Sequence, residues 1–358
     1  MTDPRVKEYA RLLVEECLGV QPGWQVAVIG QPLGRPLIDE VVGQIARRGA
    51  YALMRLGFEL GANSSWLINA PEELVGTPAP ADEHVWRTVD GFIAVVAPEN
   101  TREHSDVPPE RLSAYSQGYR PVMEPYFTKE KSWVGGQYPT PALAQDAGMT
   151  LREFEEFLYG AVLIDWKALR EQMRRIADRF DAASEVRLVG QGTDLRFSLE
   201  GRRAEIDALG ANMPGGEFFF SPIEDSADGE ITFSEYPACY GGRQVPGVYF
   251  RFERGRIVDA TAAGDEDFLL ATLDTDEGAR RLGEFGIGCN PGIQQHMRNT
   301  LFDEKIEGTV HLAIGNGFPF IGGTNVSAVH WDLVKDLRRG GRIELDGGIV
   351  QENGAWQL

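Results

Sequence analysis

The chain has 358 residues, of which 42% are hydrophobic and 25% charged, and its formal net charge is −19 at pH 7. This composition is typical of a folded protein and excludes a disordered one, and the length predicts two domains. The negative charge argues against nucleic acid as a partner, because phosphates would be repelled. No segment approaches the roughly 20 consecutive apolar residues of a membrane span, so we expect no membrane partner.

The three cysteines indicate a reducing compartment. Cys17, Cys239 and Cys289 are far apart in the sequence and include no CxxC pair, so they predict neither a disulfide framework nor a zinc knuckle. The first residues lack the apolar stretch of a signal peptide. We therefore expect a cytoplasmic protein.

The first half of the chain alternates between helical and strand patterns. Apolar residues at helical spacing predict helices over residues 5–18 and 36–48. Short apolar runs predict strands at 25–29, 51–56, 91–97 and 121–124. Strands separated by helices of this length predict a doubly wound parallel sheet.

An amphipathic helix predicted over residues 165–180 marks the expected crossing between domains. Beyond it the pattern changes to short strands and turns, with a hairpin leading into 256–260. We therefore predict an α/β protein, with a doubly wound α/β domain over 1–180 and an α+β domain over 181–358.

Two of the five histidines lie in short apolar runs near the C-terminal end. His311 lies within Thr309–Gly315, and His330 precedes Asp332 by two residues. On a strand, residues two apart leave from the same face. An imidazole and a carboxylate on an apolar strand are costly to bury unless something binds them, and a divalent metal ion is the expected partner.

Two further carboxylates are candidates for the same site. Glu217 follows the turn Pro214–Gly216, whose glycines allow the backbone to approach a ligand closely. Taken alone, Glu217 is typical of an exposed residue at a strand edge. Glu284 is predicted near the end of a helix that opens with a capping box at 274–277. The helix dipole disfavours a negative charge there, which indicates a functional role.

Together these residues form a candidate metal-binding set: Glu217, Glu284, His311, His330 and Asp332. Three carboxylates against two divalent ions leave one positive charge, which a bound hydroxide cancels, as in hydrolytic two-metal sites. A single ion would instead take two histidines and one carboxylate, the facial triad of non-haem iron enzymes. The spacing of the residues leaves both possibilities open.

Several stretches resemble, in order, the thermophilic metallo-aminopeptidase family, whose members are aminopeptidase T- and S-like. They are Asp3–Val6, Pro214–Glu217, Asp274–Gly286, Leu301–Ile306, Gly308–Gly315 and Val329–Val334. The resemblance implies that the C-terminal domain is a metal-binding catalytic domain with the five residues above as ligands. It also implies a homodimer that removes N-terminal residues from short peptides. The resemblance implies two divalent ions, with zinc or cobalt preferred over manganese or iron, and a metal-activated hydroxide as the nucleophile.

Within this resemblance we assign Glu284 a catalytic role as well, as the carboxylate that carries a proton to the leaving amine. One position departs from the family, because Phe318 stands where a tyrosine is usual, seven residues after His311. Phenylalanine can neither ligate a metal nor donate a proton, and loss of an oxyanion-hole donor typically costs about 10²–10³ in rate. The expected activity is therefore weakened or redirected.

Two alternatives stay open beside an active metallo-aminopeptidase. One is a mononuclear non-haem iron, ring-cleaving dioxygenase, although a facial triad does not need Glu217 or Glu284. The other is a metal-binding homologue with weakened peptidase activity. Lys305 could neutralise a carboxylate near the metals, but a surface position is expected, and His296 is expected on a solvated helix.

Overall fold

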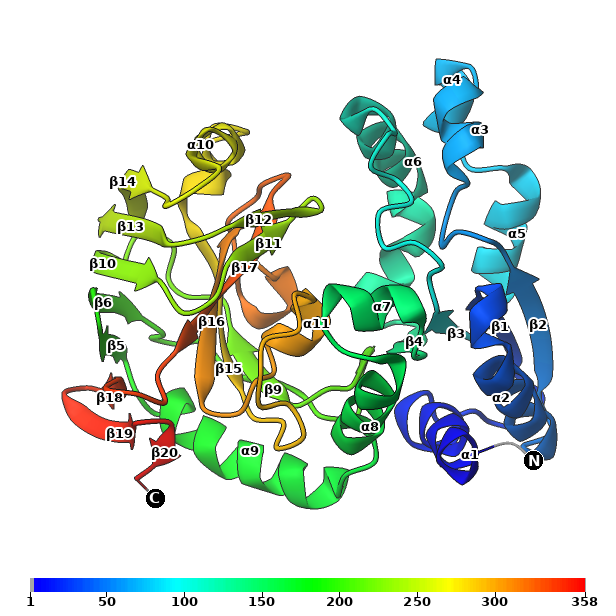
Figure 1. Cartoon of the computed structure of the whole chain (residues 1–358), viewed down its shortest axis with the longest axis horizontal. Coiled ribbons are helices and arrows are strands. Elements are labelled where there is room, and N and C mark those ends of the chain that lie inside the picture. Colours follow the sequence, from blue (N-terminus) through cyan, green and yellow to red (C-terminus); the bar gives the residue numbers. More distant parts are fainter. Residues whose placement is uncertain (1–2, 358) are drawn as a thin grey trace. The chain divides into compact units, whose positions relative to one another are not determined.

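The computed structural model describes residues 3–357, which divide into two compact units (Figure 1). The first unit extends to Leu163 and regains Leu209–Pro214, and the second comprises Ile164–Ala208 and the chain from Gly215 onward. The sequence placed the boundary at residue 180. The helix α9 (Trp166–Asp181) belongs instead to the second unit.

A five-stranded parallel sheet forms the centre of the first unit. Its strand order is β2-β1-β3-β4-β8, and every neighbouring pair runs parallel. The strands are β1 (Gln25–Gly30), β2 (Tyr51–Leu56), β3 (Gly91–Val96), β4 (Ser132–Gln137) and β8 (Asn212–Met213). The sheet confirms the predicted α/β architecture.

Helices cover both faces of this sheet. The helices of this unit are α1 (Pro4–Arg11), α2 (Arg35–Arg47), α3 (Ser64–Asn69), α4 (Glu72–Val75), α5 (Pro80–Thr88), α6 (Pro109–Phe127), α7 (Pro141–Asp146) and α8 (Leu151–Val162). On one face, Phe92 of β3 packs edge-on against Tyr126 of α6, with ring centroids 5.0 Å apart. On the other, a Cβ at Gly136 of β4 would come within 2.2 Å of the Tyr9 hydroxyl of α1. The glycine therefore allows α1 to lie close to the sheet.

Two local predictions in this unit need correction. The predicted strand at 121–124 is wrong, because these residues lie inside α6, which contains Pro121 and Pro125. A short apolar run does not distinguish a strand from a buried helix segment. The predicted helix over 5–18 is α1 followed by a π-helical turn, Leu12–Cys17.

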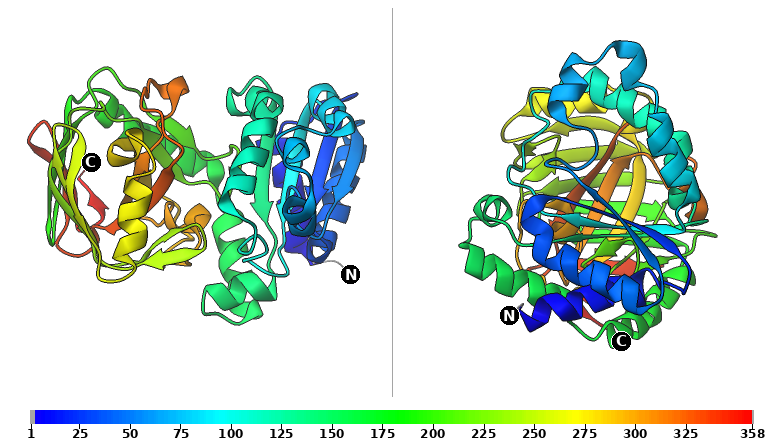
Figure 2. Two further views of the ribbon diagram at one scale, coloured as in Figure 1. Left: turned by 90° about the horizontal axis from the view of Figure 1, so that it is seen from above. Right: turned by 90° about the vertical axis from the view of Figure 1, so that its right-hand side faces the viewer.

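The second unit contains α9 and two antiparallel sheets, seen from further directions in Figure 2. The larger sheet has the order β14-β13-β10-β6-β5-β18-β19-β20, and the smaller has the order β17-β16-β15-β9-β7. The larger sheet comprises β5 (Glu185–Gly190), β6 (Thr193–Ser198), β10 (Asp228–Phe233), β13 (Val248–Glu253), β14 (Arg256–Thr261), β18 (Arg342–Leu345), β19 (Gly348–Glu352) and β20 (Ala355–Trp356). The smaller comprises β7 (Glu205–Asp207), β9 (Glu217–Phe220), β15 (Leu282–Gly288), β16 (Thr309–Gly315) and β17 (His330–Asp336). A hairpin, β11 (Ala238–Tyr240) and β12 (Arg243–Val245), and the helices α10 (Glu266–Leu273) and α11 (Thr300–Asp303) complete the unit.

Aromatic side chains fill the core between the two sheets. Phe285 of β15 packs on Phe197 of β6, with ring centroids 4.9 Å apart. Phe180, near the end of α9, lies 5.5 Å from Phe218 of β9 by the same measure. One face of the five-stranded sheet is therefore apolar and buried in the core. Among the described residues, no helix has the length and apolar character that crossing a membrane requires.

Candidate metal centre

Five polar side chains project from the smaller antiparallel sheet of the second unit, β17-β16-β15-β9-β7. They lie on the face opposite the aromatic core. They come from four neighbouring strands: Glu217 (β9), Glu284 (β15), His311 (β16), His330 and Asp332 (β17). In the strand register, Ala313 lies opposite both Glu284 and Asp332. Since alternate residues of a strand face opposite sides, this register gathers the five side chains on one face.

Glu284 lies between the two histidines. Its Oε1 is 3.4 Å from His311 Nε2, and its Oε2 is 3.2 Å from His330 Nε2. Glu217 Oε2 also lies 3.4 Å from His311 Nε2, and Asp332 Oδ1 lies 3.7 Å from His330 Nε2. Glu217, Glu284 and His311 are buried, whereas the His330 side chain is 31% exposed. The structure thus brings together all five residues that the sequence singled out.

A glycine makes room for the central histidine. Gly286 of β15 pairs with His311 across the sheet, and a Cβ at this position would lie 2.0 Å from His311 Nε2. Any other residue would therefore displace the imidazole or the strand. The absence of a side chain here is part of the site's geometry.

A hydrogen bond at Nδ1, the ring nitrogen that points away from the carboxylates, fixes the orientation of His330. Its Nδ1 lies 2.9 Å from the backbone carbonyl oxygen of Asn316, so Nδ1–H donates to that oxygen. In the neutral tautomer this leaves Nε2 with its lone pair toward Glu284 and Asp332. A histidine held by such a hydrogen bond is typical of metal ligands.

The donor atoms form two overlapping groups that fit divalent ions. Glu284, His311 and Asp332 place ligand atoms within 4.8 Å of one another, and so do Glu217, Glu304 and His311. Within residues 3–357, Glu217 Oε2, His311 Nδ1 and Asp332 Oδ1 are buried without a hydrogen-bond partner. Buried carboxylate oxygens without partners are costly, and a cation would satisfy them. Imidazole nitrogen with carboxylate oxygen suits zinc and related ions.

Burial and mutual contacts shift the pKa values of these groups in both directions. Burial raises the pKa of Glu217 to about 8 and that of Asp332 to about 6. Burial alone would lower the pKa of His311, but the carboxylates of Glu284 and Glu217 outweigh it and raise the value to about 9. For Glu284, burial acts to raise the pKa, but hydrogen bonds from the two imidazoles lower it to about 2.

Two residues at this site were missed or misplaced by sequence reasoning. Glu304 was not singled out, and Lys305 was expected at the surface. Lys305 is in fact fully buried, with Nζ 3.0 Å from Glu217 Oε1, and it donates a hydrogen bond to Glu304. Both follow the short helix α11 within the family-like stretch Leu301–Ile306. That resemblance was the one available signal for them.

The predicted location of Glu284 on a helix is wrong. The helix α10 ends at Leu273, and only a 3₁₀ turn, Gly278–Arg280, precedes β15. The backbone N–H of Ala279 donates to Asp276, so the expected capping box at Asp274 does not start a helix. Glu284 is therefore a strand residue, and its role follows from the register of the sheet.

His296 also differs from its predicted exposed helical position. Its ring stacks on Tyr236, with centroids 4.8 Å apart, and its Nε2 lies 3.2 Å from Asp303 Oδ2. The Asp303 carboxylate accepts hydrogen bonds from the backbone N–H groups of Met297 and Asn299. These contacts tie the loop before α11 to the residue that precedes Glu304.

Phe318 lies beside the site, as its place in the sequence predicted. Its ring centroid is 5.2 Å from that of His330 and 5.4 Å from that of Phe219. Its backbone N–H donates to Ser221 Oγ at 3.0 Å. Phe318 therefore presents an apolar surface to the more exposed of the two imidazoles.

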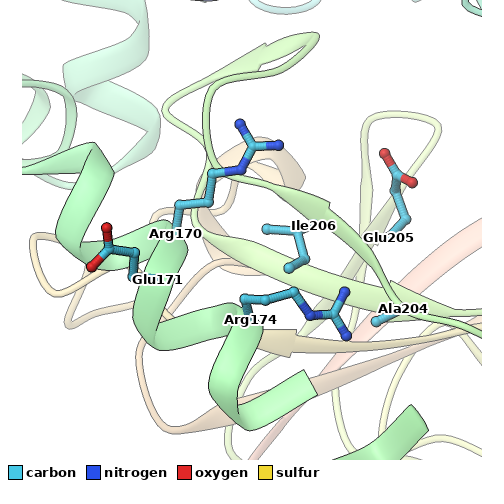
Figure 3. A pocket seen from close by; sticks show the side chains of 6 residues that line it. All are labelled: Arg170, Glu171, Arg174, Ala204, Glu205 and Ile206. Carbon is cyan, nitrogen blue, oxygen red and sulfur yellow. The ribbon is translucent and has the colours of Figure 1, made fainter. Parts of the chain in front are cut away.

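A pocket of about 420 Å³ lies elsewhere in the second unit. Arg170 and Arg174 extend from α9 toward Glu205 and Ile206 of the edge strand β7 (Figure 3). Arg174 already forms ion pairs with Asp178 and Asp181 of its own helix. The residues that line this pocket include none of the candidate metal ligands.

Comparison with known proteins agrees with this chemistry. Residues 2–356 match the family described as thermophilic metalloprotease (M29). The chain is 27% identical over 357 residues to aminopeptidase 2 of Geobacillus stearothermophilus, a match that covers 88% of this chain and 84% of the relative.

Two solved structures share the fold. Wild-type AmpT from Thermus thermophilus superposes with a TM-score of 0.83 at 24% identity, covering 99% of each chain. The 2,5-dihydroxypyridine dioxygenase from Pseudomonas putida KT2440 superposes with a TM-score of 0.60 at 14% identity, covering 98% of this chain and 96% of that one. At such identities the likenesses show a common architecture, and the chemistry follows from the residues of the site.

Proposed function

The chain belongs to the thermophilic metalloprotease (M29) family, and we propose that it is a metal-dependent aminopeptidase that removes N-terminal residues from short peptides. The observation that carries this proposal is the convergence of two imidazoles and three carboxylates on one face of the five-stranded sheet. The name of the relative from Geobacillus stearothermophilus supports the aminopeptidase activity.

The proposed cofactor is a pair of divalent ions, zinc or cobalt, with manganese or iron also compatible. The proposed ligands are Glu217, Glu284, His311, His330 and Asp332, joined by Glu304. The two imidazoles support a pair of ions, because His311 lies beside Glu217 and Glu284, and His330 lies beside Glu284 and Asp332. When bound, such ions polarise the scissile carbonyl and activate a water molecule as the nucleophile.

The residues of the chain supply orientation and proton transfer. Glu284 has one oxygen toward each imidazole, so it lies within reach of both halves of the site. We assign it the transfer of a proton from the attacking water to the leaving amine. Phe318 offers no hydrogen bond to a developing oxyanion, so part of the usual transition-state stabilisation is absent.

A mononuclear iron dioxygenase is less well supported. A facial triad of His311, His330 and Asp332 would leave Glu217 and Glu284 without a function. Both carboxylates are nevertheless buried against the imidazoles. The likeness to the dioxygenase concerns the fold.

We also propose a homodimer located in the cytoplasm. The sequence has three cysteines that lie far apart and include no CxxC pair, which is typical of a reducing compartment. Light scattering of the purified protein should give twice the chain mass. A mass equal to that of one chain would contradict the dimer.

The test of function combines metal removal with a matched pair of histidine variants. Apoprotein should not hydrolyse peptides with a free N-terminus, and zinc or cobalt should restore activity. Acetylated peptides should resist cleavage. His330→Ala should abolish activity, whereas His84→Ala, at an exposed position of α5, should not. Equal hydrolysis by apoprotein, His330→Ala and the metal-loaded protein would refute the proposal.

A further inference from the structure

A buried lysine lies at one of the two groups of metal-ligating atoms. The Lys305 side chain is fully buried, and its Nζ is 3.0 Å from Glu217 Oε1. The same ammonium donates a hydrogen bond to Glu304 Oε1. It therefore contacts both carboxylates of the group formed by Glu217, Glu304 and His311.

The other group has no such cation. Among the described residues, neither Glu284 nor Asp332 forms an ion pair with a lysine or an arginine, and the side chains beside them are the imidazoles of His311 and His330. Each group thus contains two carboxylates, and both groups share His311. The charge of the group with Glu217 and Glu304 is already partly neutralised by the Lys305 ammonium. A metal ion entering that group meets a like charge in a buried, weakly screened environment.

The two positions therefore differ in the net charge that they offer to an ion. A divalent ion at Glu284, His311 and Asp332 balances two carboxylates. A divalent ion at Glu217, Glu304 and His311 shares its carboxylates with Lys305 and leaves an excess positive charge there. Metal affinity follows the charge of the ligand set, so the two affinities should be unequal.

We propose that Lys305 competes with the second metal ion for Glu217 and Glu304, so that the chain binds one ion tightly and the other weakly. The tight position is the group of Glu284, His311 and Asp332, which also has the His330 imidazole beside it. The inference rests on the proposed function, since it concerns the same site. It adds that occupancy of the second position, and with it the fully assembled site, depends on the free metal concentration.

The chain offers a matched control for the loss of a buried ammonium. Lys335 of β17 is also buried, and its Nζ lies 2.8 Å from Glu235 Oε1 and 2.8 Å from the carbonyl oxygen of Thr232. It touches neither metal-ligating group. Lys335→Met therefore removes the same charge from the same unit without changing the ligand sets.

The experiment is a titration of apoprotein with Co²⁺ or Zn²⁺, followed by calorimetry and elemental analysis. The wild-type chain should bind one equivalent tightly and a second about 10–100-fold more weakly. Lys305→Met should tighten the second equivalent by a similar factor and leave the first unchanged. Lys335→Met should give the wild-type profile. If Lys305→Met does not fold, Lys305→Gln and the wild-type titration still decide the question.

The outcomes separate this inference from the proposed function. Two equivalents of equal affinity in the wild type, unchanged by Lys305→Met, would overturn the role of Lys305 and leave the aminopeptidase proposal standing. Failure of the wild type to bind any of these ions would overturn both. Tightening by Lys335→Met as well would show that the effect is not specific to Lys305, and would also overturn the inference.

Discussion

The smaller antiparallel sheet of the second unit, β17-β16-β15-β9-β7, has one apolar face and one face with buried charged side chains. On the core face, Phe218 and Phe285 pack against the aromatic ring of Phe180. On the other face lie Glu217 and Glu284, each of which directly precedes one of these phenylalanines. A carboxylate oxygen of each lies 3.4 Å from His311 Nε2. One step along a strand separates a side chain of the aromatic core from one that belongs to the candidate metal centre.

Polar residues on such a strand indicate a binding site only when the register of the neighbouring strands is known as well. The core face gains stability from apolar burial, so its residues follow general rules of composition. The site face carries buried oxygens without partners, which makes it unfavourable until a cation is bound. Variants that affect one face and spare the other can therefore test whether the two roles are separate.

Among the variants that compare the two faces, Glu284→Gln should have the largest effect on activity. The amide keeps an oxygen that can approach a metal but loses the capacity to accept a proton, so we expect kcat to fall by about 10²–10⁴. Steady-state kinetics on a dipeptide, together with metal analysis, would measure this. The control is Glu352→Gln, at an exposed position of the larger sheet. Retention of wild-type kcat in Glu284→Gln would exclude the proton-carrying role.

Phe318→Tyr should act in the opposite direction. Its ring lies 5.2 Å from that of His330, so a hydroxyl on it could reach the substrate. Restoring an oxyanion-hole donor is expected to raise kcat by up to about 10²–10³. Phe320→Tyr is the matched control, since Phe320 lies next to Phe318 but is 45% exposed. If Phe318→Tyr and Phe320→Tyr both leave kcat unchanged, the phenylalanine does not limit the reaction.

Gly286→Ala should also reduce activity, by a steric route. The added methyl group would lie 2.0 Å from His311 Nε2, which forces the imidazole or the strand to move. A displacement of about 1 Å in a catalytic site can cost about 10² in rate, and metal affinity should fall with it. Gly160→Ala is the control, because a Cβ there has no atom within 4 Å. Wild-type metal affinity in Gly286→Ala would show that the site tolerates the shift.

Much of this arrangement was predictable from the sequence. The alternation of His330 and Asp332 defined a strand face, and the apolar runs around His311 defined its neighbour. In the first unit, buried strands separated by helices predicted the parallel sheet. These patterns involve residues close in sequence, so they can be recognised without knowledge of the tertiary structure.

The remaining features depend on contacts distant in sequence. Glu284 looked helical because the residues before it resemble a capping box, but pairing of β15 with β9 and β16 overrides that local preference. Lys305 looked exposed because lysine is rarely buried without a partner, and its partner Glu217 is 88 positions earlier in the chain. Apart from the family-like stretch Leu301–Ile306, the sequence carries no signal of the contact between Lys305 and Glu217.

The smallest effect on activity is expected from Phe220→Ala on the core face of β9. Phe220 is fully buried and faces Phe180, with ring centroids 6.0 Å apart. Its truncation leaves a cavity and should lower the free energy of unfolding by about 3–5 kcal/mol, as measured by urea denaturation. Phe320→Ala, at an exposed position, should change it by no more than about 0.5 kcal/mol. Because Phe220 points away from the imidazoles, metal affinity and kcat of the folded variant should stay near wild type at low temperature. If Phe220→Ala lowers metal affinity as much as Gly286→Ala does, the two faces of the sheet are coupled, and the separation of fold from function along these strands does not hold.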